Sequence, residues 1–588
     1  MTRRTLLKSL AAAATASRPV NVVLILTDDQ GYGDLACHGN PVLKTPDIDA
    51  LHRRSVRFTN FHVSPTCSPT RSALMTGRYT NAAGAWHTIA GRSLLRPGEV
   101  TLADCFHASG YRTGIFGKWH LGDNYPCRPQ DRGFDEVVIH GGGGVWQTPD
   151  YFGNDYTDDV YFHNGKPRPF QGFCTDVWFG EGMRFMDEAS RQGKPFFCYI
   201  PTNAPHGPMW ASGRDEAPYR GVKGLPDPGF YGMIANIDDN AGRLVKFLRD
   251  RNLERDTLLI FMTDNGSSSG AQVFNAGMRG QKGSPYEGGH RVPFFVSWPR
   301  GGLGQPRDIA TLAAHIDVLP TLIDLLRLKR PAGLPLHGKS LRPLLFEDKP
   351  QWADRSVVVD SQRLENIARW RQAAVMTDQW RLVNPSPDGS ESRLELYDIR
   401  LDPGQRSNIA SQHPEVVARL KADYQQWWEQ ISPGASEPVR IVLGSDAENP
   451  SRLTCHDWHG GGADETWNQR GIRKAPAANG FWTVDIARAG EYRIELRRWP
   501  KEVDLPVNAA YADPRPNRET APGRAINAVQ ARLKVASVDQ RLPVQAGDKG
   551  IVFSVRLPAG AAELQTWFYD KDGAERGAYF VYAERLKP

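Results

Sequence analysis

Two apolar segments, each followed at once by acidic residues, constrain the fold of this chain more than any other feature. Residues 21–26 read Asn-Val-Val-Leu-Ile-Leu and lead into the Thr-Asp-Asp of residues 27–29. Residues 257–262 repeat the arrangement and lead into the Thr-Asp-Asn of residues 263–265. Continuous apolar runs of this length are typical of strands buried on both faces of a parallel sheet. Because ligands gather at the carboxyl ends of such strands, the sequence predicts an α/β domain with a site at this edge.

The polar side chains at these two strand ends indicate a divalent cation. Asp28 and Asp29 are adjacent carboxylates, which repel each other when buried unless a cation neutralises them. Asp264 and Asn265 would bring two more oxygen-bearing side chains to the same edge. Hard oxygen ligands favour Ca²⁺ or Mg²⁺ over Zn²⁺. A solvated loop is the alternative for either segment alone, but the recurrence of the pattern favours a metal site.

A short turn presents one thiol beside one fixed cation. It reads Cys67-Ser-Pro-Thr-Arg71 and continues as Ser72-Ala-Leu-Met-Thr-Gly-Arg78. Pro69 fixes φ and stiffens the turn, while Arg71 offers a planar fork of donors to an oxyanion. The run that follows predicts a helix whose first amides lie near the thiol. A buried structural thiol, or half of a disulfide, is the alternative interpretation of Cys67.

Further cationic and imidazole side chains stand on glycine-rich or proline-rich segments. Lys118 and His120 are two residues apart, so they would share one side of an extended segment. His206 lies between two prolines on a loop that the prolines make rigid. Lys282 stands in a glycine-rich loop, where the backbone can approach an anion closely. The tetraglycine at residues 141–144 lacks a following P-loop lysine and is interpreted as a loop near the site.

Taken in chain order, these segments resemble the type I, formylglycine-dependent sulfatases of the alkaline-phosphatase-like superfamily. Residues 67–78 match every fixed position of the signature C-[ST]-P-x-R-x-x-L-x-T-G-R. Residues 117–122 read G-K-W-H-L-G, and residues 279–293 resemble the family's R-G-x-K-x-x-x-x-E-G-G-x-R-V-P segment. The resemblance is close between residues 21 and 293 and extends more weakly to about residue 432.

The resemblance implies a sulfuric ester hydrolase whose Cys67 is oxidised to formylglycine by a maturation enzyme. The hydrated aldehyde would attack sulfur with one hydroxyl and release sulfate with the help of the other. The resemblance implies a Ca²⁺ site, with Mg²⁺ as the alternative, formed by Asp28, Asp29, Cys67, Asp264 and Asn265. The cationic residues would bind the sulfate or its bridging oxygen, namely Arg71, Lys118, His206 and Lys282. His120 would act as the base that lets the aldehyde reform.

The expected fold class is α/β, with a large mixed sheet sandwiched by helices, a small antiparallel α+β subdomain and an additional C-terminal β-sandwich-like domain. We predict a signal peptide at 1–18, a catalytic domain at 19–350, the small subdomain at 351–432 and an accessory β-rich domain at 439–588. Period-2 alternation and glycine turns indicate the sandwich. Its tryptophans, which include Trp458, Trp467 and Trp499, are interpreted either as sugar contacts or as core residues.

The N-terminus predicts export. Arg3 and Arg4 precede a short apolar run, as in a twin-arginine signal, and residues 14–16 offer an Ala-x-Ala cleavage site. The alternative is a basic terminus of a cytosolic protein. Beyond it, no stretch approaches the roughly 18–20 apolar residues that span a bilayer. We therefore expect a periplasmic or extracellular protein without a transmembrane segment.

Composition excludes other classes of partner and metal site. A formal charge of +6 over 588 residues is too small for a nucleic-acid coat. The seven cysteines are dispersed and form no CxxC pair, so a zinc cluster is not indicated. Whether the six cysteines other than Cys67 are reduced or paired stays open.

The substrate is expected to be a sulfated polysaccharide or its oligosaccharides, because an extra exported β-rich domain suits a polymer better than a free aryl sulfate. Trp86 and His87 follow the signature closely and are predicted to line the substrate subsite. Two other functions stay open. One is a phosphonate or phosphodiester hydrolase of the same superfamily, and the other is a non-catalytic binder of sulfated glycans whose Cys67 is never oxidised.

Overall fold

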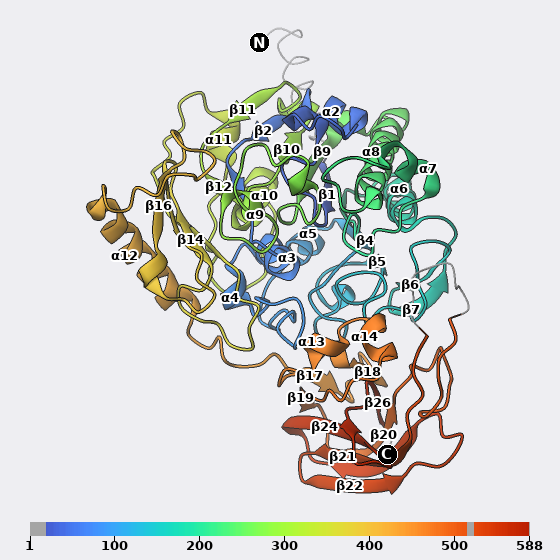
Figure 1. The fold of residues 1–588 in the computed structure, drawn as a ribbon. Helices are drawn as coiled ribbons and strands as arrows, with labels where there is room; N and C mark the ends of the chain where they lie inside the picture. The colour runs from blue at the N-terminus through green and yellow to red at the C-terminus, as the bar shows by residue number, and fades with distance from the viewer. Residues whose placement is uncertain (1–18, 514–521, 587–588) are drawn as a thin grey trace.

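The computed structural model describes residues 19–513 and 522–586, which form three successive parts (Figure 1). The first is a large sheet between helices, the second a small sheet beside α12 (Pro414–Ile431), and the third a β-rich unit at the C-terminus. The signal peptide predicted for residues 1–18 lies outside the described residues. Within the described residues, no helix is both long and apolar enough to cross a membrane.

The large sheet has ten strands and is mixed, as the sequence predicts. Its order is β11 (Arg307–Ile309), β2 (Val56–Phe58), β10 (Phe294–Ser297), β9 (Thr257–Thr263), β1 (Asn21–Thr27), β8 (Phe196–Pro201), β4 (Arg112–Gly117), β5 (Glu136–Ile139), β6 (Val160–His163) and β7 (Lys166–Pro169). The central strands from β9 to β5 are parallel to one another. β1 and β9 are the two apolar segments that precede acidic residues, and they are direct neighbours.

Helices cover both faces of the large sheet, because successive residues of its buried strands point to opposite sides. Leu24 and Leu26 of β1 enter one hydrophobic cluster, whereas Val23 and Ile25 enter another. The first face packs against α3 (Cys67–Thr76), α5 (Leu102–Ala108) and α10 (Val318–Leu326). The second face packs against α2 (Pro46–His52), α6 (Cys174–Arg191) and α8 (Pro228–Asp250).

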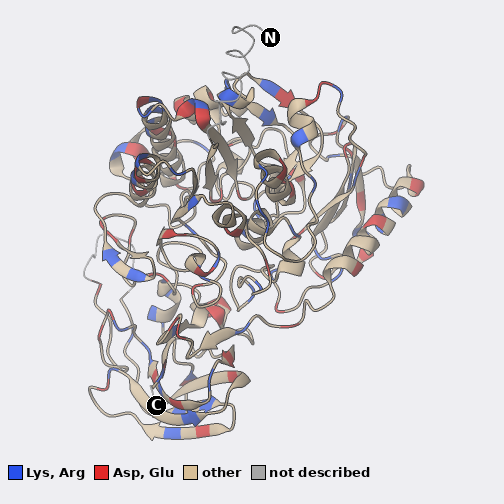
Figure 2. Cartoon of the chain, turned by 180° about the vertical axis from the view of Figure 1, so that it is seen from behind, with Lys and Arg blue, Asp and Glu red and all other residues tan. Residues whose placement is uncertain are grey.

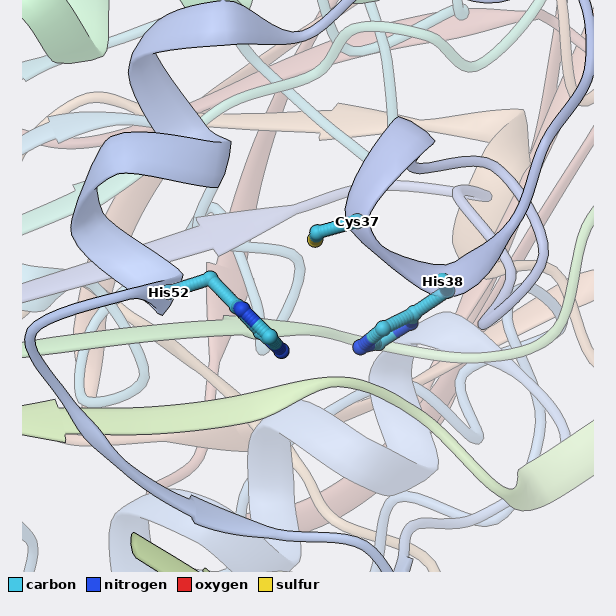
Figure 3. Close-up of side chains that lie close together, drawn as sticks. All are labelled: Cys37, His38 and His52. Atoms are coloured by element: carbon cyan, nitrogen blue, oxygen red, sulfur yellow. The ribbon is translucent and has the colours of Figure 1, made fainter. Parts of the chain in front are cut away.

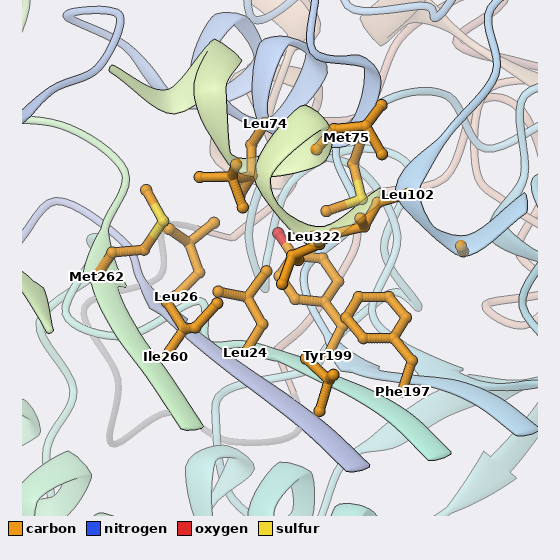
Figure 4. Packing of buried hydrophobic residues seen from close by; sticks show 14 of the residues in the cluster. Leu24, Leu26, Leu74, Met75, Leu102, Phe197, Tyr199, Ile260, Met262 and Leu322 are labelled. Carbon is orange, nitrogen blue, oxygen red and sulfur yellow. The ribbon is translucent and has the colours of Figure 1, made fainter. Parts of the chain in front are cut away.

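Helix α3 is held by its apolar side chains. Figure 4 shows Leu74 and Met75 of this helix pointing toward the strand residues Leu26 and Tyr199, and all four are buried. Losing one such side chain to alanine costs about 2–5 kcal/mol in a well-packed core. This packing fixes the helix whose first residue is Cys67.

The small sheet is an antiparallel meander that sits between the large part and α12. Its strands are β13 (Val357–Asp360), β14 (Ala373–Met376), β15 (Trp380–Asn384) and β16 (Glu395–Asp398). One face contacts α3 through Ala73, and the other face contacts α12 through Leu420 and Tyr424. The small antiparallel α+β subdomain that the sequence predicts is therefore present.

A buried ion pair joins the small sheet to the large part. Arg381 of β15 donates to Glu287 at 2.7 Å, and both side chains are almost completely inaccessible. Burial alone would raise the pKa of Glu287, but the charge of Arg381 outweighs it and holds the pKa well below its usual range. We expect Glu287→Ala to lower the free energy of unfolding by about 3–5 kcal/mol, because it leaves an uncompensated buried charge.

Thermal and urea unfolding of the purified variant measure this loss. The control is the double variant Glu287→Leu with Arg381→Leu, which removes both charges and should be more stable than Glu287→Ala alone. A single variant as stable as the unmodified protein would contradict the role given to this pair.

The C-terminal part is a sandwich of two sheets around one hydrophobic core, as predicted. One sheet contains β17 (Ile441–Leu443), β19 (Phe481–Ile486), β24 (Gly560–Asp570), β21 (Ala528–Val535) and β22 (Val538–Pro543), with β25 (Glu575–Arg576) paired to β24. The other contains β18 (Ser451–Thr454), β26 (Phe580–Arg585), β20 (Gly490–Arg497) and β23 (Ile551–Leu557). Trp458 and Trp499 are fully buried in the core, which favours the packing interpretation of these two residues.

The charged side chains are spread over the chain (Figure 2), and its cysteines are unpaired. Acidic and basic side chains are interspersed in all three parts of the chain, so the positive charge is not gathered on one part (Figure 2). All seven cysteines lie in the described residues and are free thiols. The structure thus pairs none of the six cysteines other than Cys67 in a disulfide.

Candidate active site

The two acidic segments meet at the carboxyl edge of the large sheet. Thr27 at the end of β1 is in register with Thr263 at the end of β9, so the residues that follow lie side by side. The backbone N–H of Asp29 donates to Asp264 Oδ1 at 3.1 Å, and Asn265 Nδ2 donates to Asp29 Oδ1 at 3.0 Å. With Asp28, these side chains are buried, so the structure brings the predicted metal ligands together.

The thiol of Cys67 completes this cluster from the N-terminus of α3. Its Sγ lies 3.9 Å from Asp29 Oδ1. Cys67 Sγ and one carboxylate oxygen each of Asp28 and Asp264 lie within 4.8 Å of one another. Burial raises the pKa of this thiol to about 12. At neutral pH the unmodified thiol is therefore protonated, which makes it a weak nucleophile.

The donors of this cluster fit a hard divalent cation. Asp28 Oδ1 and Asn265 Oδ1 are buried and have no hydrogen-bond partner among the described residues. Burial and the neighbouring carboxylate of Asp28 together raise the pKa of Asp264 to about 7, although Arg71 opposes them. Unsatisfied buried oxygens and crowded carboxylates are what a bound Ca²⁺ or Mg²⁺ would neutralise.

Two fully buried cations hold the inner side of the cluster. Arg71 donates to Asp264 Oδ2 from NH2 at 2.9 Å and from Nε at 3.2 Å. Its NH1 also donates to the carbonyl of Lys118 at 3.0 Å. Lys118 Nζ lies 2.5 Å from Asp28 Oδ2. The motifs around Arg71 and Lys118, which are separate in sequence, are thus in direct contact.

Lys282 and His206 lie on the more open side of the cluster. Lys282 Nζ forms an ion pair with Asp29 Oδ1, and His206 Nε2 lies 3.8 Å from Asp29 Oδ2. Their side chains keep 15% and 17% of their accessible surface, whereas those of Arg71 and Lys118 keep at most 1%. Burial lowers the pKa of His206 to about 4, so its imidazole is neutral at neutral pH. An anion would therefore approach from this side.

His120 is held beside the cluster in a strained backbone conformation. Its φ of 59° lies in the left-handed region, which a non-glycine residue rarely adopts outside functional places. Its Nε2 lies 2.9 Å from the carbonyl of Thr88. The carbonyl requires a proton on Nε2, so in the neutral ring the lone pair is on Nδ1. Burial lowers the pKa of His120 well below its usual value, and the charge of Lys118 adds to this effect.

The tetraglycine lies between the two imidazoles, as its interpretation as a loop near the site requires. A Cβ on Gly143 would lie 2.2 Å from Cε1 of His120, so only glycine allows this approach. A Cβ on Gly144 would lie 3.6 Å from Nδ1 of His206. A distance of 3.6 Å is ordinary contact, so glycine is required only at position 143, where the backbone packs directly on the ring of His120.

Trp86 and His87, the predicted substrate contacts, lie in the loop that also holds Thr88. Trp86 is 2% exposed and donates its indole N–H to the carbonyl of Leu364 at 3.0 Å. The indole therefore packs against the small part of the chain. His87 Nδ1 accepts a hydrogen bond from the backbone N–H of Thr88 at 2.7 Å. Both side chains are therefore buried and held by contacts within the protein, and their role as substrate contacts stays a prediction.

A second cluster of residues whose side chains can ligate metals lies outside this site. It was not predicted from the sequence. Figure 3 shows the side chains of Cys37, His38 and His52 close together, and one ligand atom of each lies within 4.8 Å of the others. However, the Arg57 guanidinium lies 3.4 Å from His52 Nδ1. Burial and the nearby Asp49 carboxylate hold the pKa of the Cys37 thiol far above its usual range. A cation at the ring and a protonated thiol favour a packing role for this cluster.

Comparisons with known proteins identify the relatives of this chain. Residues 20–328 match the family model described as Sulfatase, and residues 281–430 match the model described as N-sulphoglucosamine sulphohydrolase, C-terminal. Both matches end before β17, so neither covers the C-terminal sandwich. The first match spans more than half of the 588 residues.

Individual relatives agree with the family models. Arylsulfatase A of Homo sapiens is 31% identical over 516 residues, which cover 77% of this chain and 96% of the relative. N-acetylgalactosamine-6-O-sulfatase of Bacteroides thetaiotaomicron is 30% identical over 489 residues, which cover 69% of this chain and 92% of the relative. The crystal structure of Ps i-CgsB in complex with k-i-k-neocarrahexaose has a TM-score of 0.62 and 28% identity, and the alignment covers 70% of this chain and 92% of that chain.

Proposed function

Because this chain belongs to the sulfatase family and is a sulfuric ester hydrolase, we propose that it removes sulfate from a sulfated glycan at the centre built around Cys67. The observation that carries the proposal is the convergence of Cys67 with carboxylates and fixed cations at one edge of the sheet. The fold class predicted from the sequence, that of the alkaline-phosphatase-like superfamily, is confirmed.

The state of Cys67 is the first part of the proposal. A thiol whose pKa is raised to about 12 is a poor nucleophile at neutral pH, which supports its conversion by a maturation enzyme. Formylglycine at this position would supply a hydrated aldehyde, one hydroxyl of which attacks sulfur while the other later allows sulfate to leave. The N-terminal position of Cys67 on α3 places the helix dipole where negative charge develops.

The cationic residues bind and orient the sulfate ester. Arg71 and Lys118 hold the inner carboxylates, and we assign them the sulfonate oxygens nearest to residue 67. On the open side, Lys282 and His206 would bind the remaining oxygens and the bridging oxygen of the leaving alcohol. His120 takes up a proton at Nδ1, since its Nε2 proton is held by Thr88. Fixed donors of this kind stabilise charge without reorganisation at the moment of reaction.

A divalent cation, Ca²⁺ with Mg²⁺ as the alternative, would be held by Asp28, Asp29, Asp264 and Asn265 together with residue 67. When bound, it would act as a Lewis acid that favours the ionised nucleophile and neutralises the carboxylates. In its absence, the carboxylates at this edge repel one another, as the raised pKa of Asp264 indicates.

Removal of the cation should therefore lower both activity and stability. After treatment with a chelator and desalting, we expect sulfate release to fall by at least about 100-fold, since charge stabilisation at the nucleophile is lost. The melting temperature should also fall, because a ligand that binds only the folded state stabilises it. Addition of Ca²⁺ should restore both quantities, and a chelated protein with unchanged melting temperature and activity would contradict the metal site.

The glycan substrate rests on the named relatives. One is an N-acetylgalactosamine-6-O-sulfatase, and a related structure was solved in complex with k-i-k-neocarrahexaose, a carbohydrate. Sulfate release from a panel of sulfated glycans and oligosaccharides tests this point. Turnover of simple aryl sulfates without sulfate release from any glycan in the panel would overturn the substrate class. It would leave the reaction class intact.

The competing phosphoester chemistry is tested with matched substrates. Rates on the sulfate and phosphate monoesters and the phosphodiester of one alcohol should differ by orders of magnitude in favour of the sulfate. A preference for a phosphate ester would contradict the proposal. Binding of sulfated glycan without any sulfate release would instead favour the non-catalytic binder.

Export through a twin-arginine signal belongs to the same proposal. This route carries folded proteins, so Cys67 could be oxidised in the cytoplasm before the protein leaves it. The signal is supported by Arg3, Arg4 and the apolar run after them in the sequence. N-terminal sequencing of exported protein should start after residue 16, and intact residues 1–16 in that fraction would contradict the signal.

A further inference from the structure

The C-terminal sandwich reaches the centre described above, and we propose that its His456 is a positioning residue for His120. The inference rests on the proposed function, because it takes His120 to be the base in sulfate release. Neither family match extends to the sandwich, so this contribution belongs to the added part of the chain.

His456 lies beside His120 at the junction of the sandwich and the large part. It belongs to η9 (Cys455–Asp457), which directly follows β18, and it is 1% exposed. The centroids of the two imidazole rings are 6.2 Å apart, and the rings are tilted by 55°. Asp457 Oδ1 lies 3.3 Å from His456 Nδ1. That carboxylate favours a proton on Nδ1 and so leaves the lone pair of the neutral ring on Nε2.

The two neighbouring imidazoles each have a buried nitrogen without a hydrogen-bond partner. Neither His456 Nε2 nor His120 Nδ1 has such a partner among the described residues. An unpaired buried polar atom costs about 1–3 kcal/mol. A catalytic role is one explanation for keeping such an atom. Two such atoms lie on neighbouring rings, and the backbone of His120 is left-handed. Together these features indicate a functional pair.

One loop connects the two histidines. Thr88 accepts from His120 Nε2 through its carbonyl, and the backbone N–H of Ala90 donates to the carbonyl of His456 at 2.9 Å. Gly91 follows, and a Cβ there would lie 2.4 Å from Nε2 of His459. Glycine at position 91 therefore permits the close contact between this loop and the sandwich. The position of the sandwich consequently fixes the carbonyl that orients His120.

A second set of contacts, made by residues 143–148, supports His120. Gly143 packs on the ring, and its N–H donates to Gln147 Oε1 at 2.8 Å. Thr148 then bonds to the sandwich, since its N–H donates to the carbonyl of Trp467 at 2.9 Å. The sandwich thus supports both loops that enclose the imidazole of His120.

His456 should therefore affect catalysis through His120 without touching the substrate. Besides His456, the charged groups that face His120 are Lys118 and Arg71, and the carbonyl of Thr88 holds its Nε2. Mutation of a residue that orients a functional side chain typically changes activity by about 10- to 100-fold. When His456 is protonated, its charge opposes protonation of His120, so loss of His456 should also let His120 take up its proton at higher pH.

The test compares two substitutions in the full-length, mature enzyme. His456→Gln removes the ring beside His120, whereas Glu448→Ala disturbs the same junction elsewhere, by removing the carboxylate that accepts the backbone N–H of Tyr125 at 2.9 Å. The measurements are kcat, KM, the pH profile of kcat and the melting temperature.

For His456→Gln we expect kcat to fall by about 10- to 100-fold. Its KM should stay unchanged, and the acidic limb of its profile should move to higher pH. For Glu448→Ala we expect a lower melting temperature with unchanged kcat and acidic limb.

Two results would overturn the inference. One is a His456→Gln enzyme with the kcat and acidic limb of the unmodified protein. The other is an equal loss of kcat in both variants, which would mean general damage to the junction. If His456→Gln does not fold, Asp457→Asn is the second test, because it removes the carboxylate that holds His456 Nδ1 and should lower kcat while KM stays unchanged. Absence of sulfate release from the unmodified enzyme would instead contradict the proposed function.

Discussion

Replacement of Cys67 by alanine is expected to abolish sulfate release, with kcat reduced by at least about 10⁴-fold, the scale seen when a nucleophile is removed from a catalytic unit. The side chain is small and lies at the first residue of α3, so its loss should leave the packing of this helix on the sheet intact. Sulfate release and the melting temperature, measured on the same preparation, separate lost chemistry from lost folding.

A second cysteine variant supplies the control for this experiment. Cys105 is a fully buried thiol in α5, away from the carboxylates, and Cys105→Ala should keep kcat while losing some stability. Cys67→Ser adds a further comparison, since serine keeps a hydroxyl nucleophile but lacks the second hydroxyl of a hydrated aldehyde. A Cys67→Ala enzyme with more than a tenth of the original activity would contradict the assignment of Cys67.

Substitution of Arg71 should have the next largest effect. Arg71→Lys keeps the positive charge but cannot contact Asp264 Oδ2 from two nitrogens and the carbonyl of Lys118 at the same time. We expect kcat to fall by about 10²- to 10³-fold, the scale for loss of one donor in an oxyanion site. Steady-state kinetics at saturating substrate and Ca²⁺ measure this loss.

Arg381→Lys is the matched control, because Arg381 is an equally buried arginine in an ion pair outside the centre. Both variants should lose stability, since a lysine replaces a planar donor in each case. Only Arg71→Lys should lose kcat at temperatures where both proteins are folded. If the two variants lost kcat to the same extent, the effect would be general destabilisation and the role of Arg71 would be wrong.

Much of the proposed catalytic centre could be predicted from the sequence because its residues follow strongly patterned elements. The apolar runs before Asp28 and Asp264 are buried strands, and two such parallel strands that pair in register must place the residues after them together. Cys67 and Arg71 lie one helical turn apart at the start of α3, so their proximity is local. These relations depend only on strand and helix geometry.

Other features could not be predicted, because they depend on how separate parts of the chain pack. His456 stands in an ordinary Cys-His-Asp sequence, and only the docking of the sandwich brings it to His120. The burial of the tryptophans in the sandwich could not be predicted either. Trp458 and Trp499 are fully buried, whereas Trp467 keeps part of its surface, and the sequence pattern around them did not separate these outcomes.

The most direct test of the account is mass spectrometry of the peptide that contains Cys67, from protein made in a host with the maturation enzyme. We expect a mass about 18 units lower than that of the unmodified peptide, because the thiol-bearing side chain becomes an aldehyde. The fraction of modified protein should also match the fraction of active sites. Folded, active protein that carries only an unmodified thiol at residue 67 would contradict the central claim.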